Sequence, residues 1–192
     1  VGSSAASDVY KRQFFNSGIF TNLSQDHLDY HKNLKEYLKA KLYLFENLIK
    51  KRGNIISDEK ILEFKKLKKI ASNKNLKLYS FIDKKNNFQY LSHEFRGESQ
   101  ILEVKYDNLI HKIQINLIGK IQLKNILMAI IAAEKSNIDI KEIFKVLPNI
   151  KSVKGRFEKI GKIKNRSKVI LDYAHTPDAL KTCLVNLKAV SY

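Results

Sequence analysis

The chain has 192 residues, 44% of them hydrophobic, a formal net charge of +17 and a single cysteine. This length and composition suffice for one domain with a sizeable core, or for one domain and part of another. The lone Cys183 excludes an internal disulfide, and no apolar run approaches the roughly 20 residues that cross a bilayer, so we expect a cytoplasmic protein without a membrane span.

The high positive charge by itself favours nucleic acid or an anionic membrane surface as a partner. The lysines, however, are spread through almost every segment, together with many Ile and Asn residues, as is typical of proteins from AT-rich genomes. No RNP, KH, zinc-finger or helix-turn-helix pattern is present. We therefore predict no specific nucleic-acid partner, and a basic nucleic-acid-binding module is kept as the alternative from another class.

The predicted elements alternate between strands and helices, which indicates an α/β protein. Residues 1–13 are small and polar and should form a disordered tail. They resemble translated adapter sequence, as do residues 190–192, and this resemblance implies a fragment with non-native ends. Single strands are predicted at 54–56, 77–82, 157–163 and 167–173, and a short strand should end at residues 20–23. Strands or hairpins are predicted within residues 87–116. Helices are predicted at about 34–50, 59–72, 121–136, 139–147 and 177–188.

The densest chemistry lies in residues 20–45, FTNLSQDHLDYHKNLKEYLKAKLYLF. A strand end is followed by a polar turn that contains His27, and Asn33 with Glu36 forms a capping box that opens a helix. Lys41 falls within the apolar stripe of this helix, where an ammonium group is costly to desolvate and needs a partner. A neutral buried amine is also what reaction with carbon dioxide requires. The simpler interpretation is that Lys41 reaches solvent and that the histidines are ordinary loop residues.

Three later stretches could also bind a ligand. Gly119–Asn125 leads into an apolar helix, and a Gly-Arg-Phe-Glu segment occupies residues 155–158. In VILDYAHTPDAL, residues 169–180, a buried strand should end at Asp172, and Thr176 should cap a helix with Pro177 in its first turn. Anionic ligands collect where strand ends meet helix amides. An ordinary strand–turn–helix connection would explain Thr176 and Pro177 equally well, but not the group of Asp172, Tyr173 and His175.

Taken together, residues 14–189 closely resemble the Mur ligases, and within that family the MurE type. The resemblance implies part of the central ATP-binding domain in residues 14–150. It also implies a hinge and the start of a Rossmann-like C-terminal domain in residues 151–192. The Gly-x-x-Gly-Lys-Thr phosphate loop of the family is not found in the sequence. In Mur ligases it lies upstream of the region matching Phe14, so this chain alone should be inactive.

The resemblance also implies the site. His27 and an N6-carbamylated Lys41 would hold Mg²⁺, since this hard cation prefers oxygen ligands, and Arg156 would contact the ATP phosphates. In the adenine-binding segment Asn125 matches an asparagine of the family, whereas Gln122 replaces the other and Ile121 replaces a phenylalanine. Asp172 would hold the ribose, with Tyr173 and His175 near the nucleotide.

The implied reaction is ATP-dependent amide formation through an acyl phosphate. It joins a diamino acid, meso-diaminopimelate or L-lysine, to UDP-N-acetylmuramoyl-L-alanyl-D-glutamate during peptidoglycan synthesis. The nearest alternative is another amide ligase of the same superfamily, such as a cyanophycin synthetase, which has a segment similar to residues 172–180.

Overall fold

The computed structural model describes residues 14–24, 32–97, 99–164 and 167–190. These residues form two compact units, one made of residues 14–23 and 32–80 and the other of Ser24 and the described residues from Phe81 onward. The predicted tail, residues 1–13, and His27 lie outside the described residues. None of the helices in the described ranges has the length and apolar composition that a membrane span requires.

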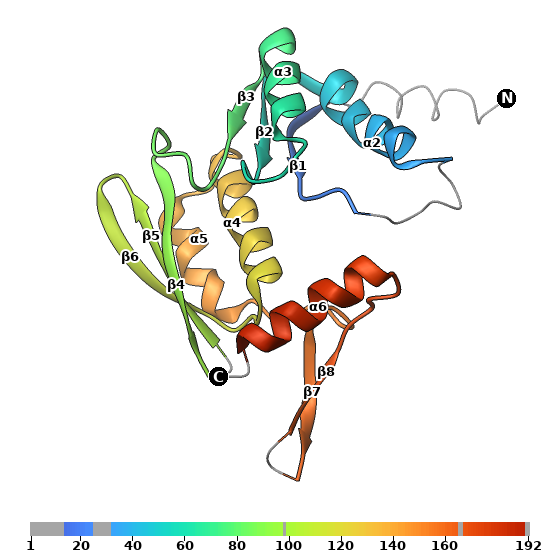
Figure 1. Ribbon diagram of the computed structural model, residues 1–192. Helices are drawn as coiled ribbons and strands as arrows, with labels where there is room; N and C mark the ends of the chain where they lie inside the picture. The colour runs from blue at the N-terminus through green and yellow to red at the C-terminus, as the bar shows by residue number, and fades with distance from the viewer. Residues whose placement is uncertain (1–13, 25–31, 98, 165–166, 191–192) are drawn as a thin grey trace, which may run out of the picture. The chain divides into compact units, whose positions relative to one another are not determined.

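The first unit contains a three-stranded parallel sheet in the order β1–β2–β3 (Figure 1). Its strands are β1 (Phe15–Phe20), β2 (Ile49–Ser57) and β3 (Lys77–Tyr79). Parallel strands need crossover connections, and these are helical: α2 (Leu34–Tyr43) continues into a π-helical turn, Leu44–Leu48, and α3 (Phe64–Lys74) joins β2 to β3. The carboxyl ends of the strands therefore lie at one edge of this sheet.

The core of the first unit forms where the helices contact the sheet. Gly18 in β1 allows the close approach, because a Cβ atom there would lie 2.9 Å from Cε1 of Phe45 and 3.1 Å from Cδ1 of Ile49. The predicted cap of α2 is confirmed, since the Asn33 side chain accepts a hydrogen bond from the Glu36 amide at 3.0 Å. The buried apolar residues of this core are Phe20, Leu38, Leu42, Phe45, Ile49, Ile55, Leu67, Ile70 and Ala71.

Several predicted boundaries in the first unit are wrong. The helix predicted for residues 34–50 ends earlier, because the buried Ile49 already starts β2. The predicted strand 54–56 is correspondingly longer, and the predicted strand 77–82 ends at Tyr79. The helix predicted from residue 59 begins only at Phe64. Asp58 accepts a hydrogen bond from the Lys60 amide at 3.0 Å, and such a local bond stabilises a turn at the expense of a helix start.

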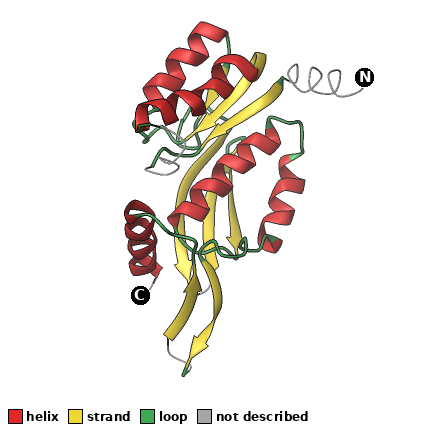
Figure 2. Cartoon of the chain, turned by 90° about the vertical axis from the view of Figure 1, so that its right-hand side faces the viewer, coloured by secondary structure: helices red, strands yellow, loops and turns green. Residues whose placement is uncertain are grey.

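The second unit begins with an antiparallel meander, β4 (Phe88–Arg96), β5 (Ser99–Tyr106) and β6 (Leu109–Ile115), as the sequence predicts. Asp107 and Asn108 turn the chain between β5 and β6 with φ angles of 46° and 69°, as a two-residue hairpin loop requires. Helices α4 (Lys120–Glu134) and α5 (Ile140–Val146) cover one face of this sheet (Figures 1 and 2). Pro148 lies in the short 3₁₀ turn that follows α5.

The chain ends with the hairpin of β7 (Glu158–Ile163) and β8 (Ser167–Leu171), followed by α6 (Pro177–Val190). The prediction of a buried strand before Asp172 is wrong. The side chains of β8 are partly or fully exposed, and Leu171 retains 47% of its surface. A strand paired on one side in a two-stranded ribbon has too few neighbours to be covered. The α/β fold class is confirmed.

Candidate functional site

In the first unit, the carboxyl ends of β1 and β2 meet at the ligand-binding edge that parallel sheets offer. Phe20 is the last residue of β1 and is paired with Ser57 of β2. The buried Ser57 hydroxyl donates a hydrogen bond to the Phe20 carbonyl at 2.8 Å. This bond fixes the direction in which the chain leaves β1 toward Thr21 and Asn22.

Lys41 of α2 contacts this strand end. Its Nζ donates a hydrogen bond to the Asn22 carbonyl oxygen at 3.0 Å and lies 4.7 Å from the centre of the Tyr37 ring. The side chain is half-buried, which lies between the two alternatives of full burial in the stripe and of an extension into solvent. Carbonyl and aromatic faces both stabilise an ammonium group, and Lys41 thereby reaches the main chain at the edge where a ligand would bind.

The groups around Lys41 fit a magnesium ion only if Nζ of Lys41 is carbamylated. Asn22 and Thr21 supply hard oxygen atoms, with Thr21 Oγ1 3.3 Å from Asn22 Oδ1. An unmodified ammonium group repels a metal cation, whereas a carbamate on Nζ would add oxygen ligands. Within the described residues no three His, Cys, Asp or Glu side chains gather to hold a metal. The other predicted ligand, His27, lies outside those residues.

Sequence reasoning missed one carboxylate at this edge. Asp58 directly follows β2 and is only 1% exposed. Its place after a strand of the first unit puts it at the same edge as the end of β1. The available signal was an aspartate that follows the apolar pair Ile55 and Ile56 by two positions.

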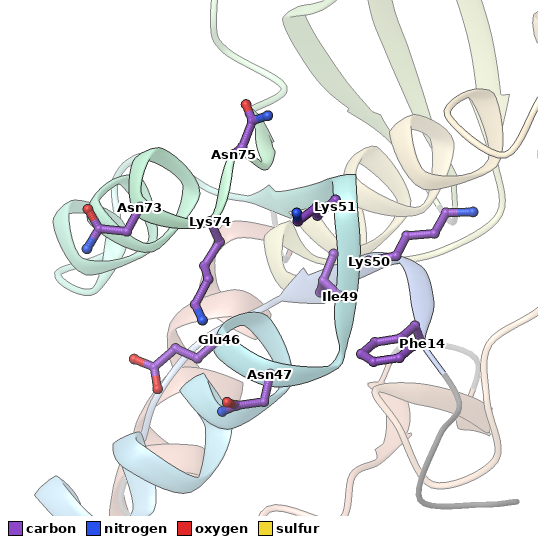
Figure 3. Close-up of a pocket in the computed structure, with 9 residues that line it drawn as sticks. All are labelled: Phe14, Glu46, Asn47, Ile49, Lys50, Lys51, Asn73, Lys74 and Asn75. Carbon is purple, nitrogen blue, oxygen red and sulfur yellow. The ribbon is translucent and has the colours of Figure 1, made fainter.

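A hollow of about 650 Å³ lies at the opposite, amino-terminal edge of this sheet (Figure 3). Exposed polar side chains from the start of β2 and the end of α3 dominate its lining, with Phe14 at one side. It is remote from the strand ends described above. Because exposed lysines occur throughout this chain, those in the hollow do not distinguish it as a binding site.

In the second unit, the Gly-Arg-Phe-Glu segment forms a tight turn. Gly155 and Phe157 have φ angles of 68° and 49°, in the left-handed region. The Glu158 carboxylate closes the turn by accepting a hydrogen bond from the Gly155 amide at 2.7 Å. This geometry leaves the Arg156 side chain exposed and buries the Phe157 ring, which packs with Ile118.

Two hydrogen bonds join this turn to the loop that follows β8. The Tyr173 amide donates to the Gly155 carbonyl at 2.8 Å. The Phe157 amide donates to Oδ2 of Asp172 at 2.8 Å, while Oδ1 of Asp172 accepts from the Ala174 amide at 2.9 Å. The two motifs, separated in sequence, are therefore joined by hydrogen bonds into one platform, made of residues 155–158 and 172–175.

Exposed side chains of this platform contact one another. The Arg156 guanidinium lies 5.0 Å from the centre of the Tyr173 ring, and the His175 ring meets the same ring edge-on at 4.9 Å. Nδ1 of His175 lies 2.9 Å from the Tyr173 carbonyl oxygen. Because a carbonyl can only accept, Nδ1 carries the proton, and in the neutral ring Nε2 is left as an acceptor.

The first turn of α4 contacts the platform. Nε2 of Gln122 donates a hydrogen bond to the Arg156 carbonyl at 3.0 Å. Asn125 is exposed three residues further along α4, and residues at this spacing share a helix face. The second unit thus brings together Gln122, Arg156, Asp172, Tyr173 and His175, with Asn125 on the adjacent turn.

Helix α6 packs behind this platform. The predicted cap is confirmed, since Thr176 accepts a hydrogen bond from the Ala179 amide at 3.2 Å. Burial and the negative charge of Asp172 raise the pKa of Cys183, which keeps this thiol protonated. Sequence reasoning missed Asn186, a buried amide on the same helix. Its signal was a polar residue within the apolar stripe of Cys183 and Leu187.

Comparisons with solved structures define the class of protein. The fold matches MurF ligase from Thermotoga maritima in complex with ADP, with a TM-score of 0.70 at 17% identity over 93% of this chain and 41% of that one. It matches the apo form of L. casei FPGS with a TM-score of 0.68 at 17% identity, over 91% and 42% of the two chains. It also matches a structure of UDP-N-acetylmuramoyl-L-alanyl-D-glutamate–2,6-diaminopimelate ligase, with a TM-score of 0.69 at 26% identity over 90% and 35%. The fold is that of the Mur and FPGS ligases.

The family model described as "Mur ligase middle domain" matches residues 1–133, and the chain belongs to the Mur ligase family. Two curated relatives carry the name UDP-N-acetylmuramoyl-L-alanyl-D-glutamate–2,6-diaminopimelate ligase. The one from Rickettsia bellii is 34% identical over 91% of this chain and 36% of its own length. The one from Fusobacterium nucleatum is 37% identical over 89% and 34%. The chain thus spans about a third of the length of these relatives, and its resemblance to the MurE type is confirmed.

Proposed function

We propose that this chain is part of an ATP-dependent ligase that forms an amide bond in peptidoglycan synthesis. The reaction adds a diamino acid, meso-diaminopimelate or L-lysine, to UDP-N-acetylmuramoyl-L-alanyl-D-glutamate. The observation that carries this proposal is the joining of the turn at 155–158 to the loop at 172–175 beside the first turn of α4. The names of the curated relatives support it.

The proposed organisation assigns residues 14–150 to part of a central ATP-binding domain and residues 151–192 to a hinge and the start of a C-terminal domain. The proposed location is the cytoplasm, where the single thiol, Cys183, would remain reduced. Binding of the UDP-linked substrate and selection of the amino acid would use other parts of the whole protein.

The grouped polar and aromatic side chains of the second unit suit an adenine nucleotide. The planar guanidinium of Arg156 offers paired donors that match two phosphate oxygens. Carboxamides such as those of Gln122 and Asn125 offer both a donor and an acceptor to a base edge. Asp172 would accept a ribose hydroxyl, and the exposed rings of Tyr173 and His175 would lie alongside the nucleotide. Burial of the nucleotide against this group would exclude water from the phosphates.

Lys41 and His27 would hold magnesium in the first unit once Lys41 is carbamylated. When bound, the ion would neutralise negative charge on the phosphate oxygens. The hydrogen bond from Lys41 to Asn22 fixes where Nζ lies, at 3.0 Å from the Asn22 carbonyl oxygen. The nearby Tyr37 ring shields one side of the amine from water.

The proposed chemistry has two steps. The γ-phosphoryl group of ATP passes to an oxygen of the D-glutamate carboxylate, which gives an acyl phosphate and ADP. The neutral amine of the diamino acid then attacks the carbonyl carbon, and the C–O bond to phosphate breaks as the amide forms and a proton is lost. Such phosphoryl transfer depends on positioning and charge neutralisation, and Arg156 would provide both at the phosphates.

Nucleotide binding by this chain tests the site. We expect a fluorescent ADP analogue to bind saturably and to be displaced by ADP. Arg156→Ala and Gln122→Ala should each weaken binding by about 10-fold, equivalent to ~1.4 kcal/mol. The matched controls are Arg96→Ala, which removes an exposed arginine, and Gln114→Ala, which removes an exposed glutamine. Equal affinity of all four variants would refute the nucleotide site.

A chimera tests the reaction. Residues 14–189 would replace the matching segment of the Fusobacterium nucleatum relative, and ligation would be followed with UDP-muramoyl dipeptide and either diamino acid. Amide formation that is abolished by Lys41→Ala in the chimera supports the proposal. Activity only on aspartate–arginine peptides would instead favour a cyanophycin synthetase.

A further inference from the structure

Asn186 of α6 makes two partly buried hydrogen bonds in the second unit. Its side chain is 6% exposed. Oδ1 accepts the amide of Lys120, the first residue of α4, at 2.8 Å across 66 positions of sequence. Nδ2 donates to the Thr182 carbonyl one turn earlier in α6, also at 2.8 Å, so the carboxamide is held in one orientation.

This contact supplies what the start of α4 lacks. The first amides of a helix have no partner within the helix and need a cap. The residue at the cap position is Gly119, which has no side chain to offer. Asn186 therefore acts as the N-cap of α4 from a different helix, and asparagine is among the residues best suited to capping.

The entry to α4 is shaped around this contact. Gly119 has a φ of 93°, and a Cβ atom there would lie 3.3 Å from both Oδ1 of Asn186 and the Phe157 ring. On the other side, the fully buried Gln100 of β5 donates a hydrogen bond to the Leu117 carbonyl at 2.6 Å. The segment before α4 is thus held from both β5 and α6.

The first turn of α4 also carries Gln122, which binds the carbonyl of Arg156. We infer that Asn186 is a positioning residue for the nucleotide site: by capping α4 it fixes the first turn of that helix, and with it the carboxamides of Gln122 and Asn125. This inference rests on the proposed nucleotide-binding function. Asn186 itself lies behind the platform and would not touch the nucleotide.

The test uses the full 192-residue chain and two readouts. The first is amide hydrogen exchange at Lys120, followed by NMR. Asn186→Leu removes the acceptor and should speed this exchange by about 10-fold or more, whereas Asn186→Asp keeps an acceptor at a helix N-terminus and should leave it slow. Asn47→Leu is the matched control, because Asn47 also bonds the carbonyl four residues before it, that of Tyr43 at 3.3 Å.

The second readout is the affinity for the fluorescent ADP analogue. Asn186→Leu should weaken binding several-fold, while Asn186→Asp and Asn47→Leu should bind as the parent chain does. If Asn186→Leu is too unstable to measure, Asn186→Ala makes the same comparison with a smaller side chain. Weakened binding only in the variants without an acceptor supports the inference.

The outcomes separate the inference from the proposed function. If Lys120 exchanges faster in Asn186→Leu but ADP binds unchanged, while Gln122→Ala still weakens binding, the positioning role is overturned and the nucleotide site stands. Unchanged exchange at Lys120 overturns the capping contact itself. If Gln122→Ala and Arg156→Ala both bind as the parent chain does, the nucleotide site is refuted, and the positioning role that rests on it is overturned too.

Discussion

The carboxylate of Asp172 accepts the backbone amide of Phe157 at 2.8 Å, and Phe157 has a φ of 49°. A left-handed conformation at a non-glycine residue costs about 1–3 kcal/mol and needs support from its surroundings. Asp172 gives this support while its other oxygen accepts the Ala174 amide. A carboxylate has about four lone-pair directions, so Asp172 retains capacity for a ribose hydroxyl.

Removing this carboxylate should destabilise the second unit. Asp172→Ala loses both hydrogen bonds, and we expect the free energy of unfolding to fall by about 2–3 kcal/mol. Asp172→Asn keeps one acceptor oxygen and should lose about half as much. Urea denaturation checks both values, with Glu94→Ala as the control because the Glu94 carboxylate forms an exposed ion pair with Arg96. A midpoint for Asp172→Ala equal to that of the control would contradict the supporting role.

Local signals in the sequence predicted most of the fold. Asn33 and Glu36 marked the start of α2 because a cap depends only on neighbouring residues. The end of that helix was not predictable in the same way. Ile49 leaves the helical pattern because it packs in the core and its strand pairs with β1, and such pairing involves residues far away in sequence.

The candidate site shows the same division. The grouping of Gln122, Arg156, Asp172, Tyr173 and His175 follows from motifs, and the resemblance to Mur ligases carried their predicted roles. The role of Asn186 could not be predicted. Its partner is the backbone amide of Lys120, and because nearly every residue has such an amide, the sequence does not indicate which one Asn186 binds. His27 lies outside the described residues, so its assignment remains a prediction.

Glycine substitutions separate backbone strain from steric conflict. Gly155 has a φ of 68° with open space around a built Cβ atom, so Gly155→Ala should cost about 1 kcal/mol from strain alone. Gly119→Ala should cost more, about 2–3 kcal/mol, because its Cβ atom would also press on Asn186 and Phe157. Thermal unfolding shows which of the two substitutions lowers the melting temperature more.

Gly161 provides the reference for this series. It has no positive φ and open space around its Cβ position, so Gly161→Ala should leave the stability unchanged or raise it by up to about 1 kcal/mol. Equal losses of unfolding free energy in Gly119→Ala and Gly155→Ala would show that the Asn186 side chain moves away from the new methyl group without a loss of stability.

Lys41→Arg tests the proposed carbamate. Arginine keeps the positive charge, but it stays protonated and cannot be carbamylated. We expect a carbamate signal in NMR spectra recorded with ¹³C-labelled bicarbonate, and its loss in Lys41→Arg but not in Lys39→Arg, an exposed control on the same helix. Stability should change by less than about 1 kcal/mol, because the lost hydrogen bond is exposed. A signal that persists in Lys41→Arg would assign the carbamate to another amine.

His93 should make the stability of the second unit depend on pH. Burial, and then the positive charge of Lys120, lower the pKa of His93, and Nδ1 of the neutral ring can accept the Tyr90 hydroxyl, which lies 2.7 Å away. Above the unfolded pKa of about 6.5 the ring is neutral in both states and stability is complete. As the pH falls below this value, the unfolded chain binds a proton that the folded chain resists, and stability is lost until the folded pKa is passed.

Urea denaturation at pH 7 and at pH 5 measures this loss. The urea midpoint should fall further between the two pH values for the parent chain than for His93→Gln, which keeps an acceptor but does not titrate. Lys112→Met, an exposed substitution in the same sheet that leaves His93 in place, is the control and should follow the parent chain. Parallel curves for the parent and His93→Gln would contradict the prediction.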